Sequence, residues 1–304
     1  MALGFLLYHG MQDKIVSIAI TTQPTTRIYE VNSSGNVTFS FAGAVVTATY
    51  KSGKTEDVTS SVTWSPTTSS ITNTTTSKTV TVTATYGEFT ATTTMTVKNP
   101  LTSIAITTQP TTRTYEVNSS GNATFDFTGA VVTATYKNGQ TKTVTPTWNP
   151  TTGSITTATA TANVTVTASY TEDSVTKTTT TTMTLNNPVT SIAITTQPTT
   201  KTYTVNSSGN VTFSFTGAVI TATYKNGKTG AVTSSTTWNP TTSSITDTTE
   251  SKNVTVTATY SSKTATTQMT VNNPVTSLSV SPTSATYLYG ATPSGTVTGL
   301  LTVI

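Results

Sequence analysis

Hydrophobic and polar residues alternate with a period of two along much of the chain. Residues 80–86 read Val-Thr-Val-Thr-Ala-Thr-Tyr, so Val, Ala and Tyr share one face and Thr covers the other. This pattern is typical of a strand half-buried in an antiparallel sheet. Residues 37–41, 44–50 and 92–97 predict further strands, and no window has the apolar period of an amphipathic helix. About seven short strands in each stretch of about 87 residues predict an all-β, two-sheet sandwich.

The pattern recurs three times. Ser-Ile-Ala-Ile-Thr-Thr-Gln-Pro-Thr-Thr occurs at residues 17–26, 103–112 and 191–200, which are 86 and 88 residues apart. A period this long indicates one domain per repeat rather than a solenoid unit. We therefore predict an apolar N-terminal segment that is a remnant strand, three full repeats and a partial fourth repeat. Their predicted bounds are 1–13, 14–99, 100–187, 188–273 and 274–304.

Short turns and linkers connect these strands and repeats. The sequences Lys-Ser-Gly-Lys, Lys-Asn-Gly-Gln and Lys-Asn-Gly-Lys, at 51–54, 137–140 and 225–228, predict hairpin turns. An Asn-Gly hairpin is expected to need positive φ at both central residues. Each repeat ends in Asn-Pro, and Pro fixes its own φ and extends the preceding residue. We expect domains joined end to end with limited bending.

These motifs resemble those of bacterial immunoglobulin-like (Big) domains, which occur in surface adhesins and phage structural proteins. The resemblance is carried by residues 115–117, by the segment 125–139, by Val144 and by Met183, and it extends over about residues 14–273. It implies tandem immunoglobulin-like β-sandwiches joined end to end. It also implies surface stalks, adhesins, wall proteins or virion appendages, and it brings no catalytic motif.

Composition and charge argue against several other classes of protein. Charged residues are 9% of the chain, the net charge is +4 without a basic cluster, and cysteine is absent. Nucleic-acid binding needs clustered cations, so we expect none. The sole histidine, His9, lies outside the repeats, and no carboxylate pair recurs, so we predict no enzyme and no cofactor or metal site. No run of 18 apolar residues predicts a membrane span.

Aromatic residues recur at fixed places in each copy. We interpret them as core anchors, because a residue repeated in every copy more often serves the shared fold. The alternative for the tryptophans is a platform on which sugars stack. The predicted anchors are Trp64, Trp148, Trp238, Tyr50, Tyr136 and Tyr224.

Recurrent cations and Asn-x-Thr triplets are the other candidate sites. Arg27, Arg113 and Lys201 correspond to one another, as do the lysines that open the three turns. Such charges either discourage edge-to-edge strand pairing or contact an anionic polymer such as a glycan. The triplets offer formal N-glycosylation sites if the source glycosylates exported proteins. The preferred acceptors are Asn36, Asn122 and Asn210.

Together these observations predict an extracellular structural or adhesive stalk on a bacterial surface. One alternative is a phage virion decoration, in the tail or head, that binds a host surface. Another is a self-assembling filament subunit, with self-association through residues 1–13 and 274–304. The expected partners are cell-surface or host glycans or proteins, and the expected location is the cell surface or the virion surface.

Overall fold

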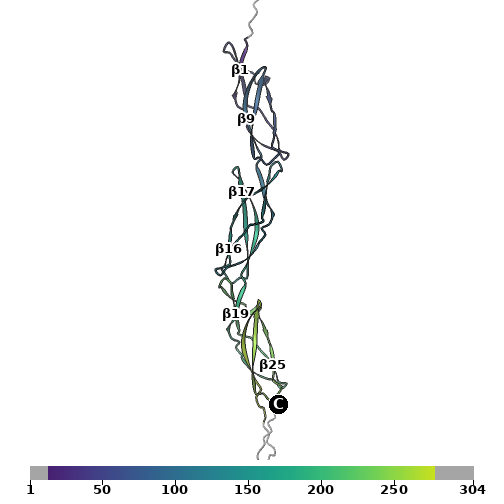
Figure 1. Ribbon diagram of the computed structural model, residues 1–304, viewed down its shortest axis with the longest axis vertical. Coiled ribbons are helices and arrows are strands. Elements are labelled where there is room, and N and C mark those ends of the chain that lie inside the picture. The colour runs from purple at the N-terminus through teal and green to yellow at the C-terminus, as the bar shows by residue number, and fades with distance from the viewer. Residues whose placement is uncertain (1–12, 278–304) are drawn as a thin grey trace, which may run out of the picture. The chain divides into compact units, whose positions relative to one another are not determined.

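The computed structural model describes residues 13–277 (Figure 1). Almost all of the N-terminal segment and most of the partial fourth repeat lie outside the described residues. The predicted self-association through these ends therefore stays a prediction. The described chain packs as two compact units, and the second repeat contributes to both: one holds residues 13–113, 126–151 and 165–182, and the other holds 114–125, 152–164 and 183–277.

The first repeat forms three hydrogen-bonded sheets. Their strand orders are β1-β4-β5, β2-β9-β8-β6 and β3-β7. All pairs are antiparallel except β2 with β9, which run parallel. The strands are β1 (Ile15–Thr22), β2 (Ile28–Glu30), β3 (Asn36–Thr38), β4 (Val45–Tyr50), β5 (Thr55–Asp57), β6 (Thr63–Ser65), β7 (Thr68–Ser70), β8 (Ser77–Tyr86) and β9 (Phe89–Lys98), with a 3-10 turn η1 (Thr59–Ser61) before β6.

The second repeat has the same strand order. Its sheets are β10-β13-β14, β11-β18-β17-β15 and β12-β16. The strands are β10 (Leu101–Thr108), β11 (Thr114–Glu116), β12 (Asn122–Thr124), β13 (Val131–Tyr136), β14 (Thr141–Val144), β15 (Thr147–Asn149), β16 (Thr152–Ser154), β17 (Thr161–Glu172) and β18 (Val175–Asn186).

The third repeat closely resembles the first in its strands and in their order. Its sheets are β19-β22-β23, β20-β27-β26-β24 and β21-β25. The strands are β19 (Val189–Thr196), β20 (Thr202–Thr204), β21 (Asn210–Thr212), β22 (Val219–Tyr224), β23 (Thr229–Ala231), β24 (Thr237–Asn239), β25 (Thr242–Ser244), β26 (Ser251–Tyr260) and β27 (Lys263–Asn272), with η2 (Thr233–Ser235) before β24. The prediction of tandem all-β sandwiches is confirmed.

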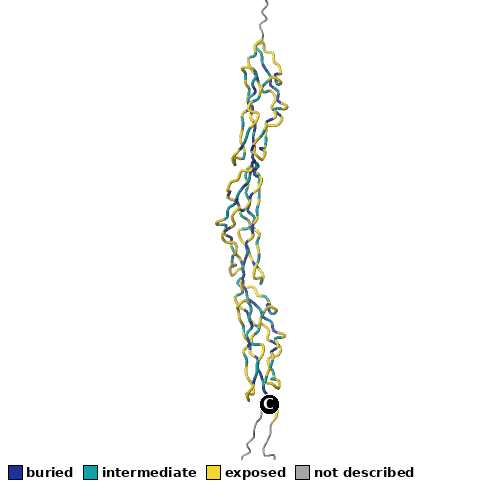
Figure 2. Tube along the Cα trace, turned by 90° about the vertical axis from the view of Figure 1, so that its right-hand side faces the viewer, coloured by how far each residue is buried: buried dark blue, intermediate teal, exposed yellow. Residues whose placement is uncertain are grey.

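Each core lies where the alternating strands turn their apolar faces inward, and the connecting loops are exposed (Figure 2). In the first repeat one cluster joins the three-stranded and four-stranded sheets through Ile18, Val46 and Ala84. A second cluster, around Phe39 and Met95, packs the four-stranded sheet against β3 and β7. Burial of one such aliphatic or aromatic side chain contributes roughly 1.5–3 kcal/mol. The third repeat has the same two clusters.

The number of strands differs from the expectation, and the structure explains why the repeats differ in length. Each repeat has nine strands rather than about seven, because several strands are only three residues long and carry no visible alternation. The second repeat also lacks the 3-10 turn, and β17 and β18 are each two residues longer than β8 and β9. These two differences account for the unequal spacing of 86 and 88 residues.

Candidate functional site: the joints between repeats

The turn between β13 and β14 contacts the first repeat, and both belong to one compact unit. The Gly139 N–H donates to Tyr136 O at 2.9 Å, which closes the turn. Gly139 has a φ of 80°, whereas Asn138 is not among the residues with positive φ. The expectation that both central residues need positive φ is therefore wrong. The asparagine serves another purpose at this position.

The Asn138 side chain joins the two repeats. Its Nδ2 donates to Ile71 O and to Asn73 O, each at 2.8 Å. Its Oδ1 accepts from the Gln140 N–H at 3.1 Å. The residue is 7% exposed. A buried amide with all its hydrogen bonds made is stabilising, and loss of one partner leaves the others unpaired.

The linker asparagine completes this contact. Asn99, which is fully buried, accepts the Asn138 N–H on its Oδ1 at 3.0 Å. Its own Nδ2 donates to Asn73 O and Thr75 O, and its N–H donates to Thr76 O. The linker is thus tied both to the end of its own repeat and to the turn of the next one. We call this pair of residues the asparagine clasp.

A glycine makes room for the clasp. Gly35 has a φ of 82°, and a Cβ there would lie 2.3 Å from Ile71 O and 3.4 Å from the Asn138 Cβ. Any larger residue would displace the carbonyl that receives the amide. The same approach to an isoleucine carbonyl recurs at Gly121 and Gly209, so this glycine serves the fold of each repeat as well as the clasp.

The second joint, within the other compact unit, repeats the clasp. Asn226 Nδ2 donates to Ile155 O at 2.7 Å and to Thr157 O at 2.9 Å. The Asn226 N–H donates to Asn187 Oδ1 at 3.0 Å. The same donors and acceptors therefore recur at equivalent positions in both joints.

An ion pair accompanies each clasp. Lys137 Nζ lies 2.6 Å from Glu30 Oε2, and Lys225 pairs with Glu116. The side chains are 39% and 52% exposed in the first pair. An exposed pair contributes about 0–1 kcal/mol, so it orients the turn more than it stabilises the joint. The sequence interpretation of these lysines as edge charges or polymer contacts did not include this pairing.

The two joints differ at their margins. In the first, Glu30 and Pro100 line a small pocket of about 120 Å³ together with Glu172 and Asp173, from the lengthened β17–β18 hairpin. In the second, Ala158 packs against the core of the third repeat, and a Cβ at Gly230 would lie 3.0 Å from the Ala158 Cβ. The residues packed around the clasp therefore differ between the two joints, although the clasp itself is the same.

The turn of the first repeat has different chemistry. Ser52 stands where Asn138 and Asn226 stand, and Asp13 stands where Asn99 and Asn187 stand. The Ser52 N–H donates to Asp13 Oδ1 at 3.0 Å, and its hydroxyl donates to the other carboxylate oxygen. A serine has one hydroxyl hydrogen and no amide, so it cannot donate to two carbonyls at once.

The predicted aromatic anchors lie in or beside the cores. Trp64 packs against both clusters of the first repeat, is half-buried, and stacks on Phe41 with ring centroids 4.4 Å apart. Trp148 and Trp238 stack likewise on Phe127 and Phe215. The tyrosines lie at the ends of the equivalent strands: Tyr136 and Tyr224 are buried and Tyr50 is half-buried.

Hydrogen bonds and burial set the titration of these tyrosines. The Tyr136 hydroxyl donates to Glu172 at 2.5 Å, and burial together with this bond raises the pKa of Tyr136. The bond from the Tyr50 hydroxyl to Glu56, at 2.9 Å, raises the pKa of Tyr50.

The predicted surface sites are exposed, and Asn36 lies beside the first joint, where it lines a hollow together with Glu30 and Lys137. Arg27, Arg113 and Lys201 stand just before β2, β11 and β20, and no ion pair involves them among the described residues. Asn36, Asn122 and Asn210 open β3, β12 and β21 with exposed side chains. Neither polymer contact nor glycosylation is tested by this geometry, so both stay predictions.

A second repeated contact was not predicted from the sequence. The glutamine of each Thr-Thr-Gln-Pro motif accepts a hydrogen bond from a buried threonine of the long hairpin. The pairs are Gln23 with Thr93, Gln109 with Thr181 and Gln197 with Thr267. The recurrence of the glutamine was the available signal, but the sequence does not show its partner. This contact ties the first strand of each repeat to the opposite sheet.

Within residues 13–277, no group of three or more His, Cys, Asp or Glu side chains could hold a metal ion. In the same part of the chain, no helix is long and apolar enough to cross a membrane. The predictions of no enzymatic activity and no cofactor stay predictions.

Comparison with known proteins gives likeness of fold only. No protein-family model and no curated protein matches this chain. Among solved structures, the titin I-band fragment I67–I69 matches with a TM-score of 0.39 and 7% identity, over 85% of this chain and 99% of that one. Immunoglobulin domains 1–5 of Sidekick-1 match with a TM-score of 0.30 and 11% identity, over 86% and 60%. Cadherin domains 1–4 of protocadherin gamma B7 match with a TM-score of 0.29 and 10% identity, over 84% and 76%.

Proposed function

We propose that this chain is a non-catalytic extracellular spacer of a bacterial surface, in which each joint holds neighbouring repeats in a fixed orientation. The observation that carries this proposal is the asparagine clasp, buried and repeated at both joints. A freely bending linker would need no buried polar contact. The short Asn-Pro linkers and the ion pairs beside the clasp favour the same role.

The clasp is tested by the spread of distances across one joint. The chain has no cysteine, so Glu88→Cys and Thr151→Cys provide two exposed sites for spin labels. Pulsed electron paramagnetic resonance should give a narrow distance distribution, and Asn138→Ser should broaden it. Asn163→Ser, the same substitution at an exposed strand position, is the control. Equal widths in all three proteins would refute the stiff-spacer role.

The proposal also includes a location on the bacterial surface and an adhesive role there. Membrane-impermeant maleimide should label the Glu88→Cys protein on intact source cells. Labelling only after lysis would contradict a surface location, and labelling of purified phage particles would favour the virion alternative.

The filament alternative is less favoured by the turn of the first repeat. Ser52 lacks the amide that both clasps use, so head-to-tail addition of copies through this contact is weak. Association through residues 1–13 and 274–304 is a separate mechanism. Sedimentation of the full chain over a range of concentrations tests it, and concentration-dependent fibres would restore the filament alternative.

A further inference from the structure

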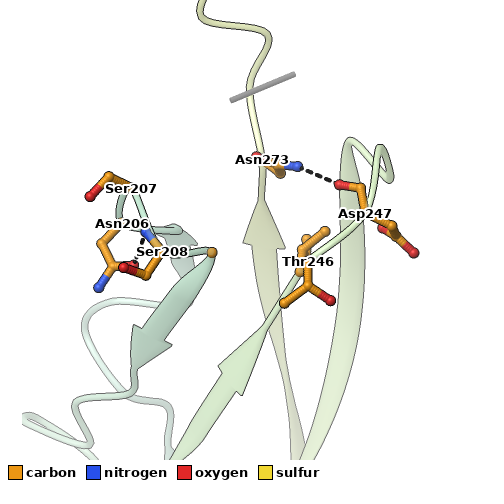
Figure 3. A pocket seen from close by; sticks show the side chains of 8 residues that line it. Asn206, Ser207, Ser208, Thr246, Asp247 and Asn273 are labelled. Atoms are coloured by element: carbon orange, nitrogen blue, oxygen red, sulfur yellow. Dashed lines mark hydrogen bonds between the residues drawn. The ribbon is translucent and has the colours of Figure 1, made fainter. Parts of the chain in front are cut away.

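The third repeat has the receiving half of a clasp. A pocket of about 230 Å³ lies at this place. It is formed by the turn after β20, the loop after β25 and the end of β27 (Figure 3). Asn206, Gly209, Ile245, Asp247 and Asn273 are among the residues that line it.

Each of these residues corresponds to one that receives a turn in the other joints. Ile245 stands where Ile71 and Ile155 accept the incoming amide, and Asp247 stands where Asn73 and Thr157 accept it. These are backbone carbonyls, so the change of side chain leaves the acceptors intact. The backbone acceptors for the amide are therefore present in all three repeats.

Asn273 is held as the linker asparagines of the two joints are held. Its N–H donates to Glu250 O at 2.7 Å, and its Nδ2 donates to Asp247 O at 3.2 Å and Thr249 O at 3.3 Å. Asn99 makes the three equivalent bonds and presents its Oδ1 to the incoming turn. Asn273 is thus oriented for the same acceptance before any partner arrives, which lowers the entropic cost of binding.

We propose that this pocket binds the Lys-Asn-Gly turn of a further immunoglobulin-like repeat, in addition to the three described above. The asparagine amide would donate to Ile245 O and Asp247 O, and the turn N–H would donate to Asn273 Oδ1. Both Lys-Asn-Gly turns of this chain are engaged in its own joints.

The charged groups around the pocket differ from those of the two joints. Glu30 and Glu116 are replaced by Thr204 in the third repeat, but the rim gains Asp247. Hydrogen bonds from the Thr249 side chain and N–H hold the pKa of Asp247 below its usual value, so the carboxylate is ionised at neutral pH. Thr204 cannot pair with an incoming lysine as Glu30 and Glu116 do, so the hydrogen bonds of the asparagine carry the contact.

A second copy of this chain is a poor occupant. Its undocked turn is Lys51-Ser-Gly-Lys54, in which the serine lacks the donating amide. The segments 49–55 and 223–229 are otherwise identical, Thr-Tyr-Lys-Ser/Asn-Gly-Lys-Thr. This chain therefore supplies a matched pair of probes that differ in one residue.

The test captures these two turns by disulfide exchange on the full chain. Ser207→Cys introduces a single thiol at the rim of the pocket, since the chain has no cysteine of its own. Backbone-cyclised peptides with the two seven-residue sequences each carry a cysteine on a flexible linker. Intact mass spectrometry at equilibrium then gives the fraction captured. The matched control is Ser33→Cys, the same position in the first repeat, where Asn138 already occupies the receiving surface.

Capture at Ser207→Cys should favour the asparagine peptide over the serine peptide on the order of tenfold, as expected for about two net hydrogen bonds. At Ser33→Cys the two peptides should be captured equally. Equal capture at Ser207→Cys, or the same preference at both positions, would overturn the proposal. The capture experiment and the distance measurement probe different sites, since the labels of the latter lie on either side of the first joint. Failure of one therefore leaves the other unaffected.

Discussion

At the residue scale, one asparagine in each of the two docked turns, Asn138 or Asn226, controls the contact between neighbouring repeats. The sequence identified the turn correctly, because Lys-Asn-Gly between two alternating segments favours a hairpin. It did not reveal the role of the asparagine, because the carbonyls that receive the amide lie more than sixty residues away in the chain. A short polar residue is expected in a turn for local reasons alone, so its presence there does not indicate a tertiary contact.

Asn138→Ser should lower the free energy of unfolding by about 1–3 kcal/mol, because two buried carbonyls lose their donor. Urea denaturation followed by tryptophan fluorescence measures this change. The Asn163→Ser control loses only an exposed hydrogen bond from Thr184, so it should stay within about 0.5 kcal/mol of the native protein. A loss no larger than that of the control would show that water replaces the amide without cost.

The ion pair at the same joint should contribute much less. A double-mutant cycle with Glu30→Gln and Lys137→Gln should give a coupling energy below about 1 kcal/mol. The coupling should also fall in molar salt, because both side chains are largely exposed. A large coupling that salt does not change would instead indicate a desolvated pair.

At the element scale, the long alternating strands were predictable and the three-residue strands were not. The strand β8 has four apolar residues in strict alternation, whereas β3 and β7 are too short to show a period. β3 and β7 pair with each other, and the equally short β2 pairs with β9, only because tertiary folding brings these segments together. The half-buried tryptophans illustrate the same limit, since their recurrence predicted importance but not which ring faces them.

Trp64→Ala should destabilise the first repeat by roughly 3 kcal/mol, because the indole packs against both core clusters. Differential scanning calorimetry would detect the loss as a lower first transition. The interpretation of Trp64 as a sugar platform predicts otherwise: truncation would then abolish glycan binding and leave the transition unchanged. Phe41 already covers one face of the indole.

At the scale of the whole molecule, few charged groups are available to make stability depend on pH. The pKa values of Asp57, Asp126 and Asp247 are lowered by hydrogen bonds from nearby threonines. A lowered pKa contributes stability above the unfolded value and loses it as pH falls through the folded value. The raised pKa of Tyr136 has the opposite sign, so its contribution is complete below the unfolded value and is lost as pH rises.

The melting temperature should therefore stay nearly constant from about pH 5 to about pH 9, and fall on both sides of this range. Tyr136→Phe should reduce the alkaline loss and leave the acid limb unchanged. Thermal unfolding monitored by circular dichroism across pH 3–11 checks both limbs. A steep change near pH 7 would contradict the expectation, since no described residue is a histidine.

The clasp has a consequence for how such a chain changes length. The second repeat carries both a turn that docks and loops that receive, so its in-register duplication would create a joint whose clasp residues already fit. Deletion of that repeat would join Asn226 to the loops that now receive Asn138. Unequal recombination can therefore add or remove whole repeats without requiring a new interface to evolve. The first repeat, with Ser52 in its turn, is the one that cannot be moved to an internal position.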